Sequence, residues 1–247
     1  MREKSPTSLP MITPSGGSEP FPQVSHESAP EELVAWALER FADQRVVVTT
    51  QFGMEGCALI DMCARAGRLV RVVYLDTMFL FPETYELRDR LQARYPLLVI
   101  ENRGTALTPE AQAEQFGDEL WKRDPDRCCG LRKVEPMRAV MQDVDVWLTG
   151  LRRSQSANRA NLQVVEWDWQ YQVLKINPLA TWSRAQVWEY IQQHDVPYNP
   201  LHKQGYPTLG CTHCTRSVPG ASVTDYSRAG RWQGQQKDEC GLHGEGI

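Results

Sequence analysis

Short apolar runs rich in β-branched residues recur through the first 150 residues, and between them apolar residues return every three or four positions. The runs have the length and composition of buried parallel strands, and they lie at residues 45–50, 69–75, 97–100 and 144–150. The segments with helical character lie at residues 31–38, 57–63, 81–95 and 133–141. Strands that alternate with helices predict an α/β fold with a mostly parallel sheet and flanking helices.

The second half of the chain is less regular. Residues 174–179 predict one more strand, and residues 183–191 predict a helix that has Ser183 as its N-cap. Residues 198–206 predict a loop, and the chain after Pro219 is polar and loop-like. Residues 1–30 are rich in Pro and Ser and predict a disordered tail. We therefore expect one domain over residues 31–232 and a mobile C-terminal tail over residues 233–247.

Composition narrows the class of protein. A chain of 247 residues with 41% hydrophobic residues can bury a full core without disulfide bonds. The net charge of −4 argues against a general nucleic-acid binder. No apolar run approaches the roughly 18 residues that span a bilayer, so no membrane partner is expected. Seven cysteines without an apolar export signal favour a reducing, cytoplasmic location.

Four of the seven cysteines form two tight clusters. Cys128 and Cys129 are adjacent, and Cys211 and Cys214 form a C-x-x-C pair. Two thiols three residues apart can face one metal, and four thiolates suit either a tetrahedral zinc or an iron–sulfur cluster. The alternative is that some of these cysteines are buried small hydrophobes. The sequence favours a ligated group.

Basic residues gather where an anion could bind. The strand, turn and helix at residues 49–60 have the arrangement that places helix N–H groups near a phosphate, although no Walker A lysine follows. The loop after the strand at 144–150 carries Arg152, Arg153 and Arg159, whose guanidinium forks match phosphate or sulfate. A second basic cluster is Arg228 and Arg231. The alternative for each is an ordinary turn or a solvated basic loop.

Two further residues stand apart from these clusters. Lys133 follows the cysteine pair by one helical turn, where a cation could serve both a metal cluster and an anionic substrate. Cys240 lies in a polar tail, and His243 follows it by three residues. An accessible thiol can react, whereas a core thiol is inert. Taken alone, Lys133 would more often be an ordinary surface residue, and an incidental tail cysteine is the slightly favoured interpretation of Cys240.

Taken together, these motifs resemble one family. The Cys-Cys pair followed by Arg-Lys, the Thr-Gly-x-Arg-Arg-x-Gln-Ser segment, the Cys-x-x-Cys-Thr-Arg segment, the Arg-x-Gly-Arg-Trp segment and the Glu-Cys-Gly-Leu-His tail occur in this order. The chain resembles the assimilatory adenylyl-sulfate reductases, which are relatives of the phosphoadenylyl-sulfate reductases. The resemblance covers roughly residues 31–244 and implies a Rossmann-like fold of the adenine nucleotide α-hydrolase type.

The resemblance also implies an activity and its residues. It implies reduction of adenylyl sulfate to sulfite and AMP in sulfate assimilation and cysteine biosynthesis, with thioredoxin or glutaredoxin as reductant. Cys240 would be the nucleophile that forms an S-sulfocysteine, with His243 beside it, and the cysteine clusters would hold a [4Fe-4S] cluster as the cofactor. The residues expected to bind the substrate are Phe52, Gly53, Lys133, Arg152, Arg159, Arg228 and Arg231, with Arg153 as a further candidate.

One position departs from the family pattern, and several alternatives remain open. The family's nucleotide loop usually begins with serine, whereas Gln51 stands here, so Thr49 or Thr50 would have to supply the hydroxyl. The alternatives are a reductase of the 3′-phosphorylated nucleotide or of both nucleotides, a tRNA thiolase of the same superfamily, and a non-catalytic zinc module. The thiolase is disfavoured because its Ser-Gly-Gly-x-Asp-Ser loop is absent. The sequence leaves a homo-oligomer open.

Overall fold

A six-stranded sheet in the order β3-β2-β1-β4-β6-β5 forms the centre of the computed structural model, which describes residues 24–237 and 239–243. Five of the six strands run parallel, and β5 pairs antiparallel with β6 at one edge. The strands are β1 (Val46–Thr50), β2 (Val70–Tyr74), β3 (Leu98–Asn102), β4 (Val146–Leu148), β5 (Val165–Asp168) and β6 (Val173–Ile176). The expected mostly parallel sheet is confirmed.

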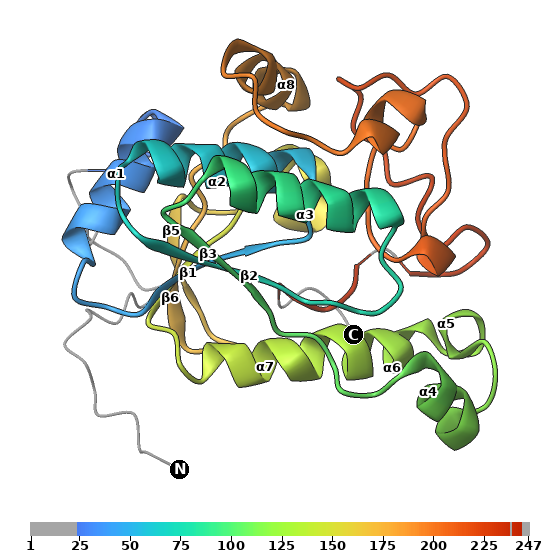
Figure 1. Ribbon diagram of the computed structural model, residues 1–247. Helices are drawn as coiled ribbons and strands as arrows, with labels where there is room; N and C mark the ends of the chain where they lie inside the picture. Colours follow the sequence, from blue (N-terminus) through green and yellow to red (C-terminus); the bar gives the residue numbers. More distant parts are fainter. Residues whose placement is uncertain (1–23, 238, 244–247) are drawn as a thin grey trace.

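Helices cover both faces of the sheet (Figure 1). On one face lie α1 (Pro30–Arg40), α2 (Met54–Arg65) and α3 (Pro82–Arg94), with α8 (Arg184–Gln193) packed against α2. On the other face lies α7 (Glu135–Met141), which continues from α6 (Pro125–Cys129) through a π-helical turn at Gly130–Val134. The short helices α4 (Pro109–Phe116) and α5 (Leu120–Arg123) precede α6.

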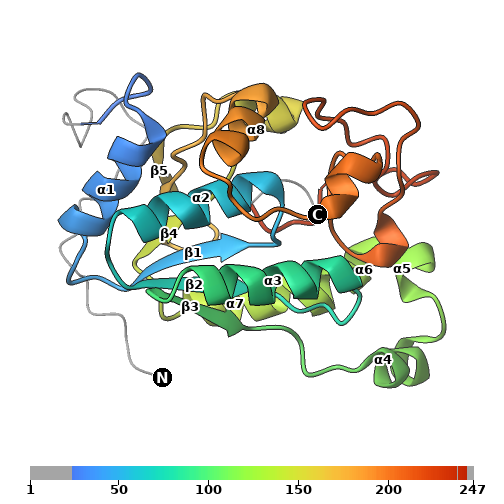
Figure 2. The ribbon, with the colours of Figure 1, turned by 45° about the horizontal axis from the view of Figure 1, so that its top comes forward.

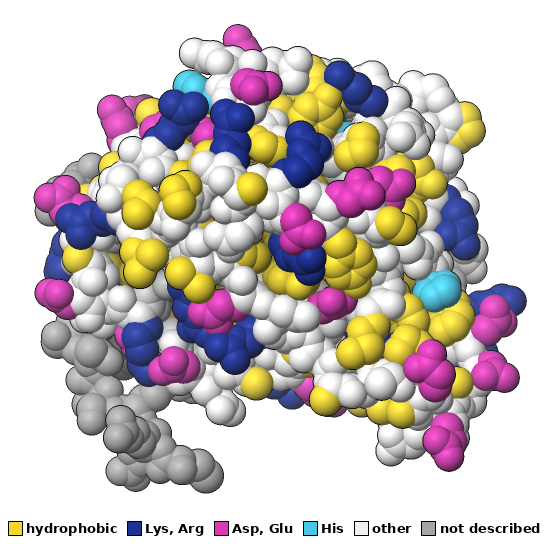
Figure 3. Space-filling view, viewed as in Figure 1, with side chains coloured by type: hydrophobic (Ala, Val, Ile, Leu, Met, Phe, Trp, Pro, Cys, Tyr) yellow, Lys and Arg dark blue, Asp and Glu magenta, His cyan; other side chains and the backbone are white. Residues whose placement is uncertain are grey.

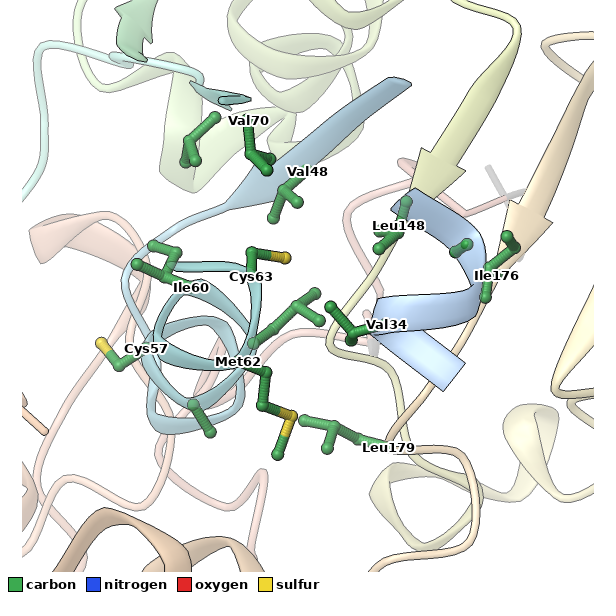
Figure 4. Packing of buried hydrophobic residues seen from close by; sticks show 14 of the residues in the cluster. Val34, Val48, Cys57, Ile60, Met62, Cys63, Val70, Leu148, Ile176 and Leu179 are labelled. Carbon is green, nitrogen blue, oxygen red and sulfur yellow. The ribbon is translucent and has the colours of Figure 1, made fainter. Parts of the chain in front are cut away.

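Alternation along the strands builds two apolar layers, because successive side chains point to opposite faces. Val48 and Leu148 face α1 and α2, where they pack with Ile60 and Met62 of α2 (Figure 4). Trp147 faces α7 and packs with methionines of that helix. The two layers bury both faces of the central strands, which explains why these strands read as continuous apolar runs.

The sheet reverses its winding between β1 and β4. The chain passes from β1 to β2 and β3 on one side, and then returns to place β4 on the other side of β1. The helical connections diverge at this point and leave a crevice outside the carboxyl ends of the two strands. The segment after about residue 200 lies at this end of the sheet, close to α5 and α6 (Figure 2).

Most elements expected from the sequence are confirmed, including the N-cap of α8. The Ser183 hydroxyl accepts a hydrogen bond from the backbone N–H of Gln186 at 3.2 Å. Four elements went unrecognised: the helices α4, α5 and α6 and the edge strand β5. The loop expected at residues 198–206 holds a 3-10 helix at Pro200–Gln204. Residues 1–23 of the expected disordered tail lie outside the described residues, and Pro30 already begins α1.

The surface and the helices agree with the composition. The face shown in Figure 3 carries basic and acidic side chains in a mixed pattern, and neither sign dominates it. Among the described residues, every helix falls short of the length or apolarity that crossing a bilayer requires.

Candidate active site

A cavity of about 210 Å³ lies at the carboxyl ends of β1 and β4. Its floor is formed by the ends of these strands, including Thr50 and Thr149. Its walls come from the start of α2, the turns after β4, the loop before the C-x-x-C pair and the C-terminal tail. Segments far apart in sequence therefore meet at the point where open α/β sheets bind ligands.

The loop from β1 to α2 is held by a threonine. The Thr50 hydroxyl accepts a hydrogen bond from the Phe52 N–H at 2.8 Å, and Phe52 adopts a left-handed backbone with φ of 57°. The Phe52 ring is buried in the core against Tyr74 and does not line the cavity. Gly53 lines the cavity as the N-cap of α2, so the N–H groups of the first helical turn are near it. The Thr49 hydroxyl instead accepts a hydrogen bond from Trp147 Nε1 at 2.8 Å. That either threonine replaces the missing serine in contacting the nucleotide stays a prediction.

A buried carboxylate organises one wall. The Glu55 carboxylate lines the cavity and accepts hydrogen bonds from Arg152 at 2.8 Å and from Arg184 at 2.9 Å. Burial alone would raise the pKa of Glu55, but the guanidinium groups of Arg184 and Arg152 outweigh it and hold the pKa at about 2. Arg152 is fully buried and does not line the cavity. Its role in the structure is to fix Glu55.

Five cationic side chains line the cavity: Lys133, Arg159, Arg184, Arg228 and Arg231. Arg159 is fixed by the acceptor Oε1 of Gln155, at 2.5 Å from its Nη1. Arg231 donates to the carbonyl of Leu209 at 3.2 Å. Such a set of guanidinium and ammonium groups matches an anionic ligand.

The C-terminal tail closes one side of the cavity. Glu239 is buried, whereas Cys240 and His243 are partly exposed; all three line the cavity. The His243 ring stacks on Trp147 with ring centroids 5.1 Å apart. Burial, reinforced by the nearby charges of Lys175 and Arg159, holds the pKa of His243 well below its ordinary range. The imidazole is therefore neutral and can offer one donor and one acceptor.

Several buried polar atoms of cavity-lining side chains find no hydrogen-bond partner among the described residues. They are Gln51 Oε1, Thr208 Oγ1, His202 Nε2, Arg231 Nε, Glu239 Oε1 and His243 Nδ1. Buried polar atoms are normally satisfied, so a cluster of unsatisfied ones at one cavity indicates a polar ligand.

A second, smaller cavity lies beside the first and brings the four clustered cysteines together. Cys128, Cys129, Cys211 and Cys214 all line it, and Lys133 lines both cavities. Cys128 and Cys129 share this cavity because α6 ends there in the π-helical turn Gly130–Val134, a distortion common at functional sites. Among the described residues, no three His, Cys, Asp or Glu side chains are arranged to hold a single metal ion.

The surroundings of the second cavity raise the pKa values of its thiols and so disfavour their thiolate forms. Burial, together with the nearby thiols, raises the pKa of Cys128 to about 12. Burial raises the pKa of Cys129 to about 11, although the cation of Lys133 opposes the shift. Burial would lower the pKa of Lys133, but the thiols of Cys211, Cys240 and Cys129 outweigh it and raise the pKa. Lys133 thus lies between the four-cysteine cavity and Cys240.

Aromatic side chains and a buried arginine surround the cysteines. The rings of Trp121 and His213 stack with centroids 3.9 Å apart, and Phe79 meets His213 edge-on at 4.7 Å. The guanidinium of Arg132 lies over Phe79 at 4.2 Å and donates to the carbonyl of Thr77 at 2.8 Å. The Thr77 hydroxyl is 3.3 Å from the Cys211 sulfur.

Comparison with known proteins identifies the family. Residues 45–217 match the model of the phosphoadenosine phosphosulfate reductase domain. The chain is 48% identical over 214 residues to the adenosine 5′-phosphosulfate reductase of Salinibacter ruber, covering 87% of this chain and 83% of that protein. The chain belongs to the phosphoadenosine phosphosulfate reductase family. Sequence resemblance to this family is thereby confirmed.

Relatives in this reductase family carry two names. The Gloeobacter violaceus relative is named phosphoadenosine 5′-phosphosulfate reductase and is 42% identical, covering 87% of this chain and 88% of that protein. Among solved structures, the phosphoadenylyl-sulfate reductase of Candida auris, in a phosphate complex, has a TM-score of 0.67 and 35% identity, covering 78% of this chain and 91% of that chain. The FMN adenylyltransferase of Candida glabrata has a TM-score of 0.53 and 14% identity, covering 85% and 74%, and shares the fold alone.

The structure brings most of the residues expected from the sequence to one cavity. Those that line it are Gly53, Lys133, Arg159, Arg228, Arg231, Cys240 and His243. Phe52, Arg152 and Arg153 do not line it. Arg153 instead donates to the carbonyl of Leu162 at 2.8 Å. Phe52 contributes through its backbone turn and Arg152 through Glu55, so a direct contact of either with substrate stays a prediction.

Sequence reasoning missed four residues of the cavity wall, three of which accept hydrogen bonds from guanidinium groups. Glu55, Gln155, Arg184 and Glu239 line the cavity and were not named as site residues. Glu55 offered one signal, because an acidic residue in the first turn after a glycine loop lies near any ligand there. Arg184 offered none, since it lies in α8, remote in sequence from every motif.

Proposed function

We propose that the protein reduces adenylyl sulfate, also called adenosine 5′-phosphosulfate, to sulfite and AMP. The observation that carries the proposal is the cavity at the strand ends, where the Cys240 thiol and the cations of Lys133, Arg159, Arg228 and Arg231 meet. The names of the relatives support this substrate class, since seven of eight at 40–48% identity are called adenosine 5′-phosphosulfate reductase.

The cavity suggests how the substrate is held. The start of α2 and the strand ends suit the nucleotide phosphate, because helix N–H groups and threonine hydroxyls gather there. The cations of Lys133 and Arg231 suit the sulfate, since no carboxylate among the described residues is paired with either of them. Neutralising the sulfate allows an anionic thiolate to approach its sulfur atom.

The chemistry then follows in two displacements. The Cys240 thiolate attacks the sulfate sulfur, the bond from that sulfur to the bridging phosphate oxygen breaks, and AMP leaves with the bonding electrons. Cys240 now carries an S-sulfo group. A dithiol reductant of the thioredoxin type attacks the Cys240 sulfur, sulfite leaves, and the second thiol of the reductant releases Cys240 by thiol–disulfide exchange. The reductant supplies both electrons.

Neutral His243 stands beside this path. Its Nδ1 atom is buried without a partner among the described residues, and its ring is fixed by Trp147. Because its pKa is low, the ring contributes a hydrogen bond rather than a charge. We assign it to orienting the sulfate or the departing groups next to Cys240.

We propose that Cys128, Cys129, Cys211 and Cys214 would hold a [4Fe-4S] cluster in the second cavity. The proposal is supported by the donor set, since four thiols with few competing oxygen ligands line one buried space. When bound, the cluster supplies a compact centre of charge beside Lys133. Iron and acid-labile sulfide analysis tests this assignment, and a colourless protein that holds one zinc would contradict it.

The decisive experiment is to capture the intermediate. After adenylyl sulfate is added without reductant, intact-mass and peptide analysis should show a sulfo group on Cys240. Cys240→Ser should form no adduct and no sulfite while keeping its iron content, because this thiol does not line the four-cysteine cavity. Absence of the adduct on wild-type protein would sink the proposal.

A second substrate is favoured by specific relatives. The Gloeobacter violaceus and Candida auris proteins are named as reductases of the 3′-phosphorylated nucleotide. Sulfite formation from the two nucleotides, compared at equal concentration with the same reductant, separates the candidates. Activity with the 3′-phosphorylated form alone would overturn the choice of adenylyl sulfate.

A further inference from the structure

The tail that carries Cys240 is anchored on both sides of the thiol. Before it, Lys237 forms an ion pair with Asp126 of α6. After it, Leu242 is buried against the layer that contains Trp147, and His243 stacks on the same tryptophan. The partly exposed Cys240 is held between these anchors at the cavity wall.

The residue that directly precedes the thiol is a buried carboxylate. Glu239 is 7% exposed, and its Oε2 atom accepts a hydrogen bond from Arg159 Nη2 at 2.9 Å. Arg228 Nη2 also donates to this oxygen, at 3.4 Å. A buried carboxylate between two guanidinium groups is held firmly in place, because moving it away would leave buried charges unpaired.

Arg159 is in turn fixed to the body of the protein. Its other nitrogen, Nη1, donates to Gln155 Oε1, and the same oxygen accepts the backbone N–H of Arg152 at 3.1 Å. These contacts lie in the two 3-10 turns that follow β4, at Arg153–Gln155 and Ala157–Arg159. Glu239 therefore docks on a guanidinium whose place is set by the end of a central strand.

We propose that Glu239 is a positioning residue for Cys240, an inference that rests on the proposed function. Neighbouring Cα atoms are only about 3.8 Å apart, so fixing the Glu239 carboxylate on Arg159 limits where the next thiol can lie. The pairing also gives the cations of the cavity two different roles. Arg159 holds the tail, whereas Lys133 and Arg231 face the cavity without a carboxylate partner among the described residues.

The competing interpretation is that Glu239 merely occupies an anion site that substrate must take over. The two interpretations predict opposite results for Glu239→Gln, which keeps the shape of the side chain and removes its charge. A positioning role predicts slower attack with nucleotide affinity unchanged. An occupying role predicts tighter nucleotide binding with attack unchanged.

The experiment uses the full-length, iron-loaded protein and three measurements. Single-turnover formation of the Cys240 adduct at saturating adenylyl sulfate should slow by about tenfold or more in Glu239→Gln, as expected for losing a charge-assisted hydrogen bond. The dissociation constant for AMP should stay within about twofold. Alkylation of Cys240 by iodoacetamide in substrate-free protein, followed by peptide mapping, should become faster because the tail is less firmly docked.

Two variants make the result decisive. Glu189→Gln, on an exposed glutamate of α8, is the matched control and should match wild type in all three measurements. Glu239→Asp keeps the charge on a shorter side chain and should fall between wild type and Glu239→Gln. Wild-type attack in Glu239→Gln, or tighter AMP binding without slower attack, overturns the inference. If wild-type protein itself forms no adduct, the proposed function fails, and the alkylation rates alone then report whether Glu239 docks the tail.

Discussion

At the scale of single residues, the cations in and around the cavity differ in whether a carboxylate pairs with them. Arg152 and Arg184 are committed to Glu55, with contacts of 2.8 and 2.9 Å, and Arg159 is committed to Glu239. Lys133 pairs with no carboxylate among the described residues and is surrounded by thiols instead. The guanidinium groups are thus held by carboxylates in the cavity wall, whereas the Lys133 ammonium group faces the cavity.

Glu55→Ala should be strongly destabilising, because it leaves two buried guanidinium groups without their carboxylate. The expected loss in the free energy of unfolding is about 3–5 kcal/mol, measured by urea denaturation. Glu189→Ala, on the exposed face of α8, should change the stability by less than about 0.5 kcal/mol. Equal stability of Glu55→Ala and wild type would show that the buried ion pairs contribute nothing net.

The stabilisation from Glu55 should also depend on pH. Its pKa is lowered from 4.5 to about 2 in the folded protein, so the unfolded chain binds the proton more readily. The contribution is therefore fully present above pH 4.5 and is lost as the pH falls towards 2. The stability difference between wild type and Glu55→Gln should shrink over this window in urea titrations at a series of pH values. A difference that stays constant below pH 4.5 would contradict the assignment.

Lys133→Ala should block the chemistry while the fold survives. The ammonium group lines both cavities and is the cation proposed to neutralise the sulfate, so adduct formation on Cys240 should slow by roughly 100-fold or more. Lys133→Arg keeps the charge and should retain more activity than Lys133→Ala. Visible absorbance and iron content serve as the readouts of the cysteine cavity. Near-normal turnover of Lys133→Ala would remove the lysine from the mechanism.

At the scale of elements, the turn from β1 into α2 depends on a close approach between Thr50 and Gly56. A Cβ atom at Gly56 would clash with the Thr50 hydroxyl, which is the group that caps Phe52. The left-handed backbone of Phe52 is uncommon for a bulky residue and is stabilised by this cap and by burial of the ring. The shape of the nucleotide loop is thus set by one hydroxyl and one missing side chain.

Gly56→Ala should therefore disturb nucleotide binding. The added methyl group displaces the Thr50 hydroxyl from the Phe52 N–H, so AMP affinity should fall by about tenfold, equivalent to one lost hydrogen bond. Isothermal titration with AMP measures the effect. Gly130→Ala is the matched control, since nothing lies within 4 Å of a Cβ there and its backbone is helical. Unchanged AMP affinity in Gly56→Ala would show that the loop tolerates the shift.

At the scale of the whole molecule, the site exists because several distant segments meet at one end of the sheet. The loop after β1, the turns after β4, the segment around Arg231 and the tail at Cys240 are among those that contribute to one cavity. The two cavities meet at Lys133. The tail adds the Cys240 thiol to the cations that the other segments supply.

Ending the chain after Lys237 should separate binding from chemistry. The truncated protein lacks Cys240, so it should form no sulfite, yet it should bind AMP within several-fold of wild type because the loop after β1 remains. It should lose roughly 2 kcal/mol of stability from the burial of Leu242, and more because the buried ion pair between Arg159 and Glu239 is also lost. Cys240→Ser is the control that keeps the tail and lacks only the thiol. Loss of AMP binding on truncation would show that the tail helps to form the nucleotide site.

The sequence by itself determined the strands, the main helices and the chemistry-bearing motifs. Buried parallel strands must be apolar on both faces, so residues 45–50 and 144–150 were recognisable without any tertiary information. The clustered cysteines were recognisable from their spacing, whereas Cys240 was singled out only by the resemblance of its Glu-Cys-Gly-Leu-His segment to the family. The edge strand β5 was not, since its Val165–Asp168 segment is short and only partly buried.

Only the tertiary structure decided which charges are partners. The sequence predicted Arg152 to be a substrate ligand and gave no reason to name Glu239 as a site residue. In the fold, Arg152 is buried against Glu55, and Glu239 docks the tail on Arg159. Ion pairs between residues 80 or 97 positions apart leave no periodic trace in the sequence, because they depend on how the strands and turns converge. The sequence motifs predict the chemistry, whereas the tertiary structure decides which charged side chains form ion pairs.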